Sequence, residues 1–197
     1  MKSSLGIAGK GAVEGTFAST PISSDGTAEE IAASFREAVS GQMERAEAEG
    51  ISISTVSVVM PGPFDYKGNG VFLMKHKFAA VYGKTFREVL GDAITPEIRL
   101  VFAHDVNGAL MGALMLYPEL GKGNVAISTL GTGLGFAHAI DGVVQESATG
   151  SPAVDIWNAP YNGSILEDFV SRRAILRFYA EQGAILADGE NVKDIAD

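Results

Sequence analysis

A glycine-rich turn between two apolar segments constrains the fold of this chain more than any other feature. Residues 125–144 form two apolar stretches joined by a turn that holds Gly131, Gly133 and Gly135. Glycine lets backbone N–H groups approach an anion without a Cβ in the way, so such a turn can hold a phosphate group. Because strand–Gly-x-Gly–strand also describes an ordinary β-hairpin, the turn alone leaves both interpretations open.

Another informative segment, which contains polar residues, lies upstream of this turn. In Phe102-Ala-His-Asp-Val-Asn-Gly108, an aspartate ends a predicted strand and opens a helix of small side chains. Asp105 could act as a general base, or it could cap the following helix. The turn is neither a dinucleotide fingerprint nor a Walker loop, since strands follow the glycines and no Gly-Lys-Ser/Thr occurs.

Four segments, in order and spacing, resemble motifs of the ROK family (repressor, open reading frame, kinase) in the actin and hexokinase superfamily. They are Val56–Asp65 with its Pro-Gly-Pro turn, Ala103–Ala109, Ser128–Gly135, and Ser164–Ala174. The resemblance covers residues 50–197. It implies an α/β, two-lobed, ribonuclease-H-like fold, with an N-terminal lobe at 1–118 and part of a C-terminal lobe at 119–197, joined by a hinge near 117–124.

The resemblance also implies a function. It indicates a glucokinase-like enzyme that uses ATP and Mg²⁺ to phosphorylate a hydroxyl of a hexose or an N-acetylated hexose. The alternative is a non-catalytic sugar-binding or transcription-regulatory protein, since the family also contains repressors. Those carry an N-terminal helix-turn-helix that this sequence lacks.

The site residues follow from the resemblance, position by position. Asp105 is the expected catalytic base, and the nucleotide phosphates are expected at Gly131, Thr132 and Gly133. Four residues are expected at the sugar: Glu167, Asp155 in place of the family's glutamate, Asn158 in place of its histidine, and His104 where many relatives have asparagine. A packing role for His104 stays open, and no residue is assigned to a protein-held metal.

Composition excludes several classes of partner. The net charge of −9 and the absence of a Lys/Arg cluster argue against nucleic acid, and no apolar run reaches the roughly 18 residues of a membrane span. We therefore expect a cytoplasmic protein. With no cysteine, the chain has no disulfide and no cysteine-ligated zinc. Many family members have a zinc loop before the glutamate helix, where this chain has Asn158–Gly163.

Hydrophobic spacing predicts the main elements. Helices are expected at 23–50, where Thr27 and Glu30 form a capping-box pattern, at 109–116, and at 166–183, with Phe178 and Tyr179 packed in a core. Strands are expected at 51–60 and 100–103.

The ends of the chain depart from the family pattern. The family's Asp-x-Gly-Gly-Thr turn is missing, so Leu5–Ala8 and Gly11–Phe17 are expected as pieces near its first two strands. The second lobe is expected to be truncated. Its apolar faces would then be covered by further residues or in a homodimer.

Overall fold

The computed structural model describes residues 1–183 and residue 192 of the 197-residue chain. The chain divides into two compact units, Met1–Ala103 and His104–Asp197. This division falls earlier than the predicted lobe boundary at 118/119. The reason is that α3 (Asp105–Leu116) packs against the strands that follow it.

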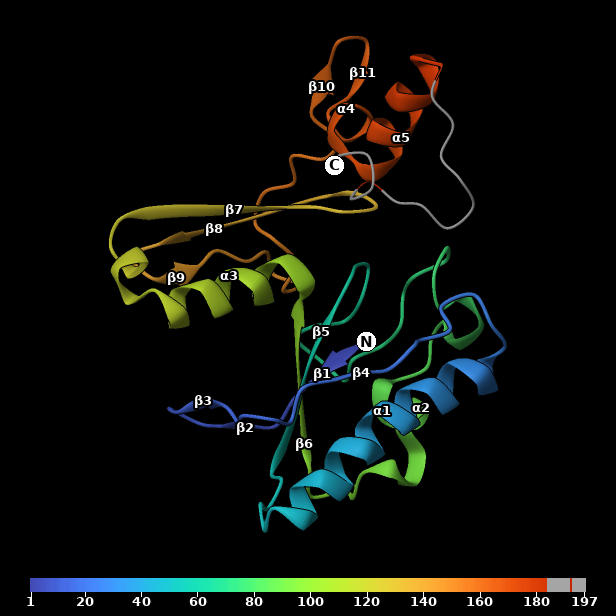
Figure 1. Cartoon of the computed structure of the whole chain (residues 1–197), viewed down its shortest axis with the longest axis vertical. Helices are drawn as coiled ribbons and strands as arrows, with labels where there is room; N and C mark the ends of the chain where they lie inside the picture. The colour runs from blue at the N-terminus through green and yellow to red at the C-terminus, as the bar shows by residue number, and fades with distance from the viewer. Residues whose placement is uncertain (184–191, 193–197) are drawn as a thin grey trace. The chain divides into compact units, whose positions relative to one another are not determined.

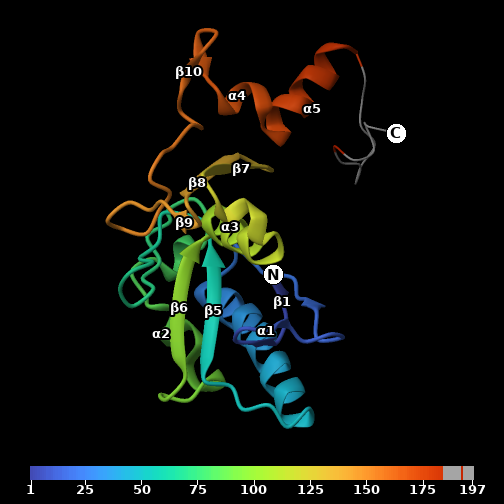
Figure 2. The ribbon, with the colours of Figure 1, turned by 90° about the vertical axis from the view of Figure 1, so that its left-hand side faces the viewer.

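The first unit is built on a long helix and a pair of strands. Helix α1 (Ala28–Ala48) begins at Thr27 as predicted, because Thr27 N–H donates to Glu30 Oε2 (2.7 Å) and Glu30 N–H donates back to Thr27 Oγ1 (3.3 Å). Strands β5 (Thr55–Met60) and β6 (Arg99–His104) are neighbours and point the same way (Figure 2). The segment before Thr55 was also predicted as strand, but Ile51 N–H instead donates to Ala46 O at the end of α1.

Phenylalanines fill the core of this unit. The Phe35 ring lies 5.2 Å from that of Phe86 and 6.0 Å from that of Phe72, measured between centroids. The connection between β5 and β6 holds η1 (Ala79–Val81), α2 (Phe86–Leu90) and η2 (Gly91–Ala93), and a second capping box starts α2. Aromatic rings in tilted and edge-on contact thus contribute to this core, together with aliphatic side chains such as Ile31 and Leu90.

The N-terminal segment forms only short ladders. Strand β1 (Lys2–Ser3) pairs antiparallel with β4 (Ala18–Ser19), and β2 (Gly6–Ile7) pairs antiparallel with β3 (Gly11–Ala12). The two pieces expected near the family's first strands thus form one small hairpin, with Lys10 N–H closing the turn on Ile7 O (2.9 Å).

A three-stranded antiparallel sheet is the centre of the second unit (Figure 1). Its strands are β7 (Asn124–Leu130), β8 (Leu134–Ile140) and β9 (Val143–Val144), and α3 packs against β7 and β8. A short η3 (Pro118–Gly121) connects α3 to β7. The sheet and α3 bury a small core of Val106, Leu110, Ala137 and Ala139.

The last described elements are β10 (Pro160–Tyr161), β11 (Ser164–Ile165), α4 (Glu167–Val170) and α5 (Arg172–Glu181). The prediction of one helix over 166–183 is wrong, because Ser171 adopts an extended backbone (ψ 165°) and caps α5. The predicted packing of Phe178 is also wrong: the residue is 64% exposed, while Tyr179 is half-buried. Among the described residues, no helix is both long and apolar enough to cross a membrane.

Candidate functional site

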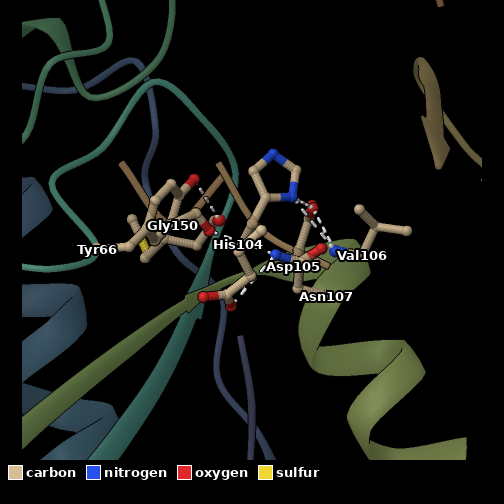
Figure 3. A network of polar contacts seen from close by, with 8 residues as sticks. Tyr66, His104, Asp105, Val106, Asn107 and Gly150 are labelled. Atoms are coloured by element: carbon tan, nitrogen blue, oxygen red, sulfur yellow. Dashed lines mark hydrogen bonds and ion pairs between the residues drawn. The ribbon is translucent and has the colours of Figure 1, made fainter. Parts of the chain in front are cut away.

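Asp105 is the first residue of α3, directly after strand β6. Its Oδ1 accepts a hydrogen bond from Val106 N–H (2.7 Å) and lies 2.8 Å from His104 Nδ1 (Figure 3). His104 is the N-cap residue of α3, so Asp105 does not occupy the capping position itself, although it accepts from the first turn. The Asp105 side chain remains 53% exposed. The carboxylate is therefore accessible to a bound substrate, which a general base must reach.

One buried amide near the start of α3 was not predicted. Asn107 is fully buried, and its Nδ2 donates to Gly150 O (3.3 Å) and Glu146 Oε1 (3.5 Å). Its Oδ1 has no hydrogen-bond partner among the described residues. Asn107 thus ties α3 to the loop after β9. The sequence feature that could have predicted this is that Asn107 is a lone amide among apolar and small residues after Asp105.

The predicted phosphate turn connects β7 to β8. Gly131 N–H donates to Gly133 O (3.0 Å), and a Cβ built on Gly131 would meet no atom within 4 Å. Within residues 1–183, the N–H groups of Thr132 and Gly133 have no hydrogen-bond acceptor. The segment is a β-hairpin, as the alternative interpretation required, and its tip also offers two backbone donors to an anion.

Gly135 brings α3 close to this turn. A Cβ built on Gly135 would lie 3.3 Å from Cβ of Val106 and would collide with the Thr129 hydroxyl. The first turn of α3 therefore packs directly on the strand that leaves the glycine turn. Since Val106 follows Asp105, the expected base and the expected phosphate turn lie on contacting elements of one unit.

The predicted sugar residues are only partly brought together. Asp155 and Asn158 are exposed in the segment between β9 and β10. Backbone bonds from Leu166 N–H to Ala159 O (2.8 Å) and from Glu167 N–H to Trp157 O (3.0 Å) hold the Asn158 segment beside Glu167. Asp155 takes no part in these bonds.

Glu167 contacts the glycine turn. Its Oε2 accepts from Leu134 N–H (2.9 Å), its Oε1 pairs with Arg173 (2.9 Å), and its side chain is only 17% exposed. Sequence reasoning placed this residue at the sugar and gave no indication of a contact with the turn.

The expected cofactors differ in what they need from the protein. The N–H groups of Thr132 and Gly133, which have no acceptor in the described part of the chain, suit phosphate oxygens, and open space at Gly131 permits the approach of a phosphate. The described residues contain no group of three metal-ligating side chains. Mg²⁺ does not require one, because it is commonly held by nucleotide phosphates, water and one or two carboxylates.

Comparison with known proteins connects the chain to one fold. No family model and no curated protein matches the sequence. Among solved structures, a ROK hexokinase from Thermus thermophilus is 25% identical, with a TM-score of 0.58 over 84% of this chain and 56% of its own. A ROK family glucokinase from Streptomyces griseus, in complex with glucose and AMPPNP, is 22% identical, with a TM-score of 0.60 over 84% of this chain and 52% of its own.

A regulator shares the same fold. A ROK family transcriptional regulator, a homologue of the Escherichia coli MLC protein, is 18% identical, with a TM-score of 0.61 over 86% of this chain and 46% of its own. The chain spans about half the length of the structures it matches. The matches confirm the predicted α/β fold class.

Proposed function

Because the chain has the fold of the ROK family in the actin and hexokinase superfamily, we propose that it takes part in ATP-dependent phosphorylation of a sugar hydroxyl. The acceptor is a hexose or an N-acetylated hexose, as in a glucokinase. An ATP-consuming reaction of this kind fits the cytoplasmic location expected from the sequence.

In the proposed reaction, Asp105 takes the proton of the sugar hydroxyl. The hydroxyl oxygen forms a bond to the γ-phosphorus of ATP while the bond to the β,γ-bridging oxygen breaks, and ADP leaves. The N–H groups of Thr132 and Gly133 hold the phosphates in line with the hydroxyl. Phosphoryl transfer depends mainly on such alignment and on charge stabilisation, with Mg²⁺ neutralising phosphate charge.

The observation that carries this proposal is the contact between α3 and β8. A Cβ at Gly135 would lie 3.3 Å from Cβ of Val106, so the helix that presents Asp105 and the turn that presents two free N–H groups belong to contacting elements. Phosphoryl transfer to a hydroxyl uses a base for the hydroxyl proton and donors that hold the phosphates, and these contacting elements supply candidates for both.

Sugar recognition is proposed for His104, Asp155, Asn158 and Glu167. Carboxylates, amides and imidazoles can each bond neighbouring sugar hydroxyls. Because Asp155 and Asn158 replace residues that differ in length or charge, the preferred sugar should differ from that of relatives with glutamate and histidine there.

A second candidate is a sugar-binding regulatory protein without catalysis. The observation in its favour is the likeness to a ROK family transcriptional regulator, whose TM-score of 0.61 is at least as high as those of the kinases. Such a protein would bind sugar and leave ATP intact.

The test is a screen for ADP formation by the purified protein with MgATP and a panel of hexoses and N-acetylated hexoses. We expect ADP formation that depends on one sugar or a few. Sugar binding by calorimetry with no ADP formed would favour the regulatory candidate. If the protein neither binds any sugar of the panel nor forms ADP with any of them, both functions are contradicted.

A further inference from the structure

Both ends of the glycine turn are hydrogen-bonded to the α4–α5 segment, one to the start of α5 and the other to the start of α4. At one end, Arg172 N–H donates to Gly131 O (2.8 Å). At the other end, Leu134 N–H donates to Glu167 Oε2 (2.9 Å). These partners are 33 residues apart in sequence, so tertiary structure and not local turn geometry brings Glu167 to the turn.

Glu167 also fills the space beside the turn. A Cβ built on Gly133 would lie 2.6 Å from Glu167 Oε2, which is closer than Cβ atoms come to other atoms in proteins. A side chain at position 133 would therefore force the Glu167 carboxylate to move away from the turn, independently of any phosphate. The mutual fit means that the position of Glu167 and the conformation of residues 131–134 depend on each other.

A carboxylate beside a phosphate site would ordinarily weaken anion binding. Here Arg173 lies 2.9 Å from Glu167 Oε1, and its side chain is 66% exposed. The pair is close to neutral as a whole, so Glu167 can accept the Leu134 hydrogen bond at reduced electrostatic cost to a nearby phosphate. A hydrogen bond with an ionised acceptor is also stronger than one between neutral groups.

We propose that Glu167 is a positioning residue for the glycine turn. By accepting the Leu134 N–H, it holds residues 131–133 in the conformation whose N–H groups of Thr132 and Gly133 stay free for nucleotide phosphates. The part of this proposal that concerns the nucleotide rests on the proposed function. The anchoring of the turn by Glu167 is independent of that function.

This role is distinct from the sugar contact that the sequence suggested for Glu167. A carboxylate has about four lone-pair sites, and the two contacts with Leu134 and Arg173 leave room for a sugar hydroxyl. The two roles predict different kinetics. Loss of a sugar contact raises the KM for sugar, whereas loss of the anchor raises the KM for ATP.

The experiment compares Glu167→Ala, Glu167→Gln and the parent protein, with Glu181→Ala as the control. Glutamine keeps an oxygen that can accept from Leu134 N–H. Glu181 is an exposed carboxylate on α5 that lies 3.9 Å from Arg177. Two quantities are measured: hydrogen exchange at the Leu134 amide by NMR without ligands, and the KM values for ATP and sugar.

We expect Glu167→Ala to speed Leu134 exchange and to raise the KM for ATP about tenfold, with the KM for sugar changed less, since a hydrogen bond to a charged group is lost. Glu167→Gln should keep most of the protection and most of the ATP affinity, and Glu181→Ala should match the parent protein.

Unchanged Leu134 exchange in Glu167→Ala would overturn the proposal, as would faster exchange with an unchanged KM for ATP. A parent protein that forms no ADP would contradict the proposed function, and the exchange rates would still decide whether Glu167 anchors the turn.

Discussion

At the scale of single residues, Gly133 shows how one position can serve two requirements. Its missing Cβ leaves room for the Glu167 carboxylate, and glycine lets an anion approach the N–H groups of the turn without a side chain in the way. Sequence reasoning found the glycines of the turn because glycine patterns are local. It could not find the carboxylate, because the Glu167–Leu134 contact spans 33 residues and depends on how α4 packs.

Gly133→Val is expected to weaken MgATP binding more than sugar binding. The new side chain would block phosphate approach and displace Glu167 from the turn. Calorimetry with each ligand checks this, with Gly121→Val as the control, because a Cβ on Gly121 meets no atom within 4 Å. Equal MgATP affinities in Gly133→Val and the parent protein would contradict phosphate binding at the turn and indicate an ordinary β-hairpin.

At the scale of helices and strands, the sequence predicted an element best where its capping residues and its hydrophobic spacing indicated the same boundaries. The start of α1 was predicted because Thr27, Glu30 and the spacing of Ile31 and Phe35 all indicate the same helix. The break between α4 and α5 was missed because apolar spacing continues across it. The signal was Ser171, whose hydroxyl accepts from Ala174 N–H (3.4 Å) and starts a new helix.

The capping box of α1 should make part of the stability depend on pH. Hydrogen bonds from the Thr27 backbone N–H and then from its side chain lower the pKa of Glu30. A lowered pKa in the folded state contributes stability above the ordinary pKa of glutamate, and that contribution is lost as the pH falls through the lowered value. Glu30→Gln should therefore lower the thermal midpoint at neutral pH, and the difference from the parent protein should shrink below about pH 4.

Glu37→Gln is the matched control for this effect, since Glu37 is an exposed glutamate on the same helix. It should change the midpoint little at either pH. A difference between Glu30→Gln and the parent protein that stays constant as the pH falls would contradict the assigned role of the Glu30 carboxylate.

At the scale of the whole molecule, motif order predicted the fold class, and the comparisons confirm it. The division into units differed because a chain's compact parts depend on packing, and α3 packs on the strands that follow it. The base, the phosphate turn and the sugar residues stay predictions from the motifs. The structure adds the contact between Gly135 and Val106, which brings the helix of the expected base against the strand that follows the phosphate turn.

Of the two ways of covering the apolar faces that the sequence left open, further residues or a homodimer, we expect the homodimer. Several large apolar side chains of the second unit are well exposed, among them Met115 (69%), Leu116 (75%) and Val143 (64%). Side chains of this kind are commonly buried between subunits. Light scattering at several concentrations measures the mass directly, and a monodisperse monomer throughout would contradict the expectation.

The central claim is that Asp105 is the base of a sugar kinase, and Asp105→Asn tests it most directly. Asparagine keeps an oxygen that can accept from Val106 N–H, so the start of α3 should be preserved. With the sugar found in the screen, we predict that kcat falls roughly 10²–10⁴-fold while the affinities for sugar and MgATP and the thermal midpoint stay close to those of the parent protein. A folded Asp105→Asn protein that keeps more than about half of the parental kcat would contradict the account.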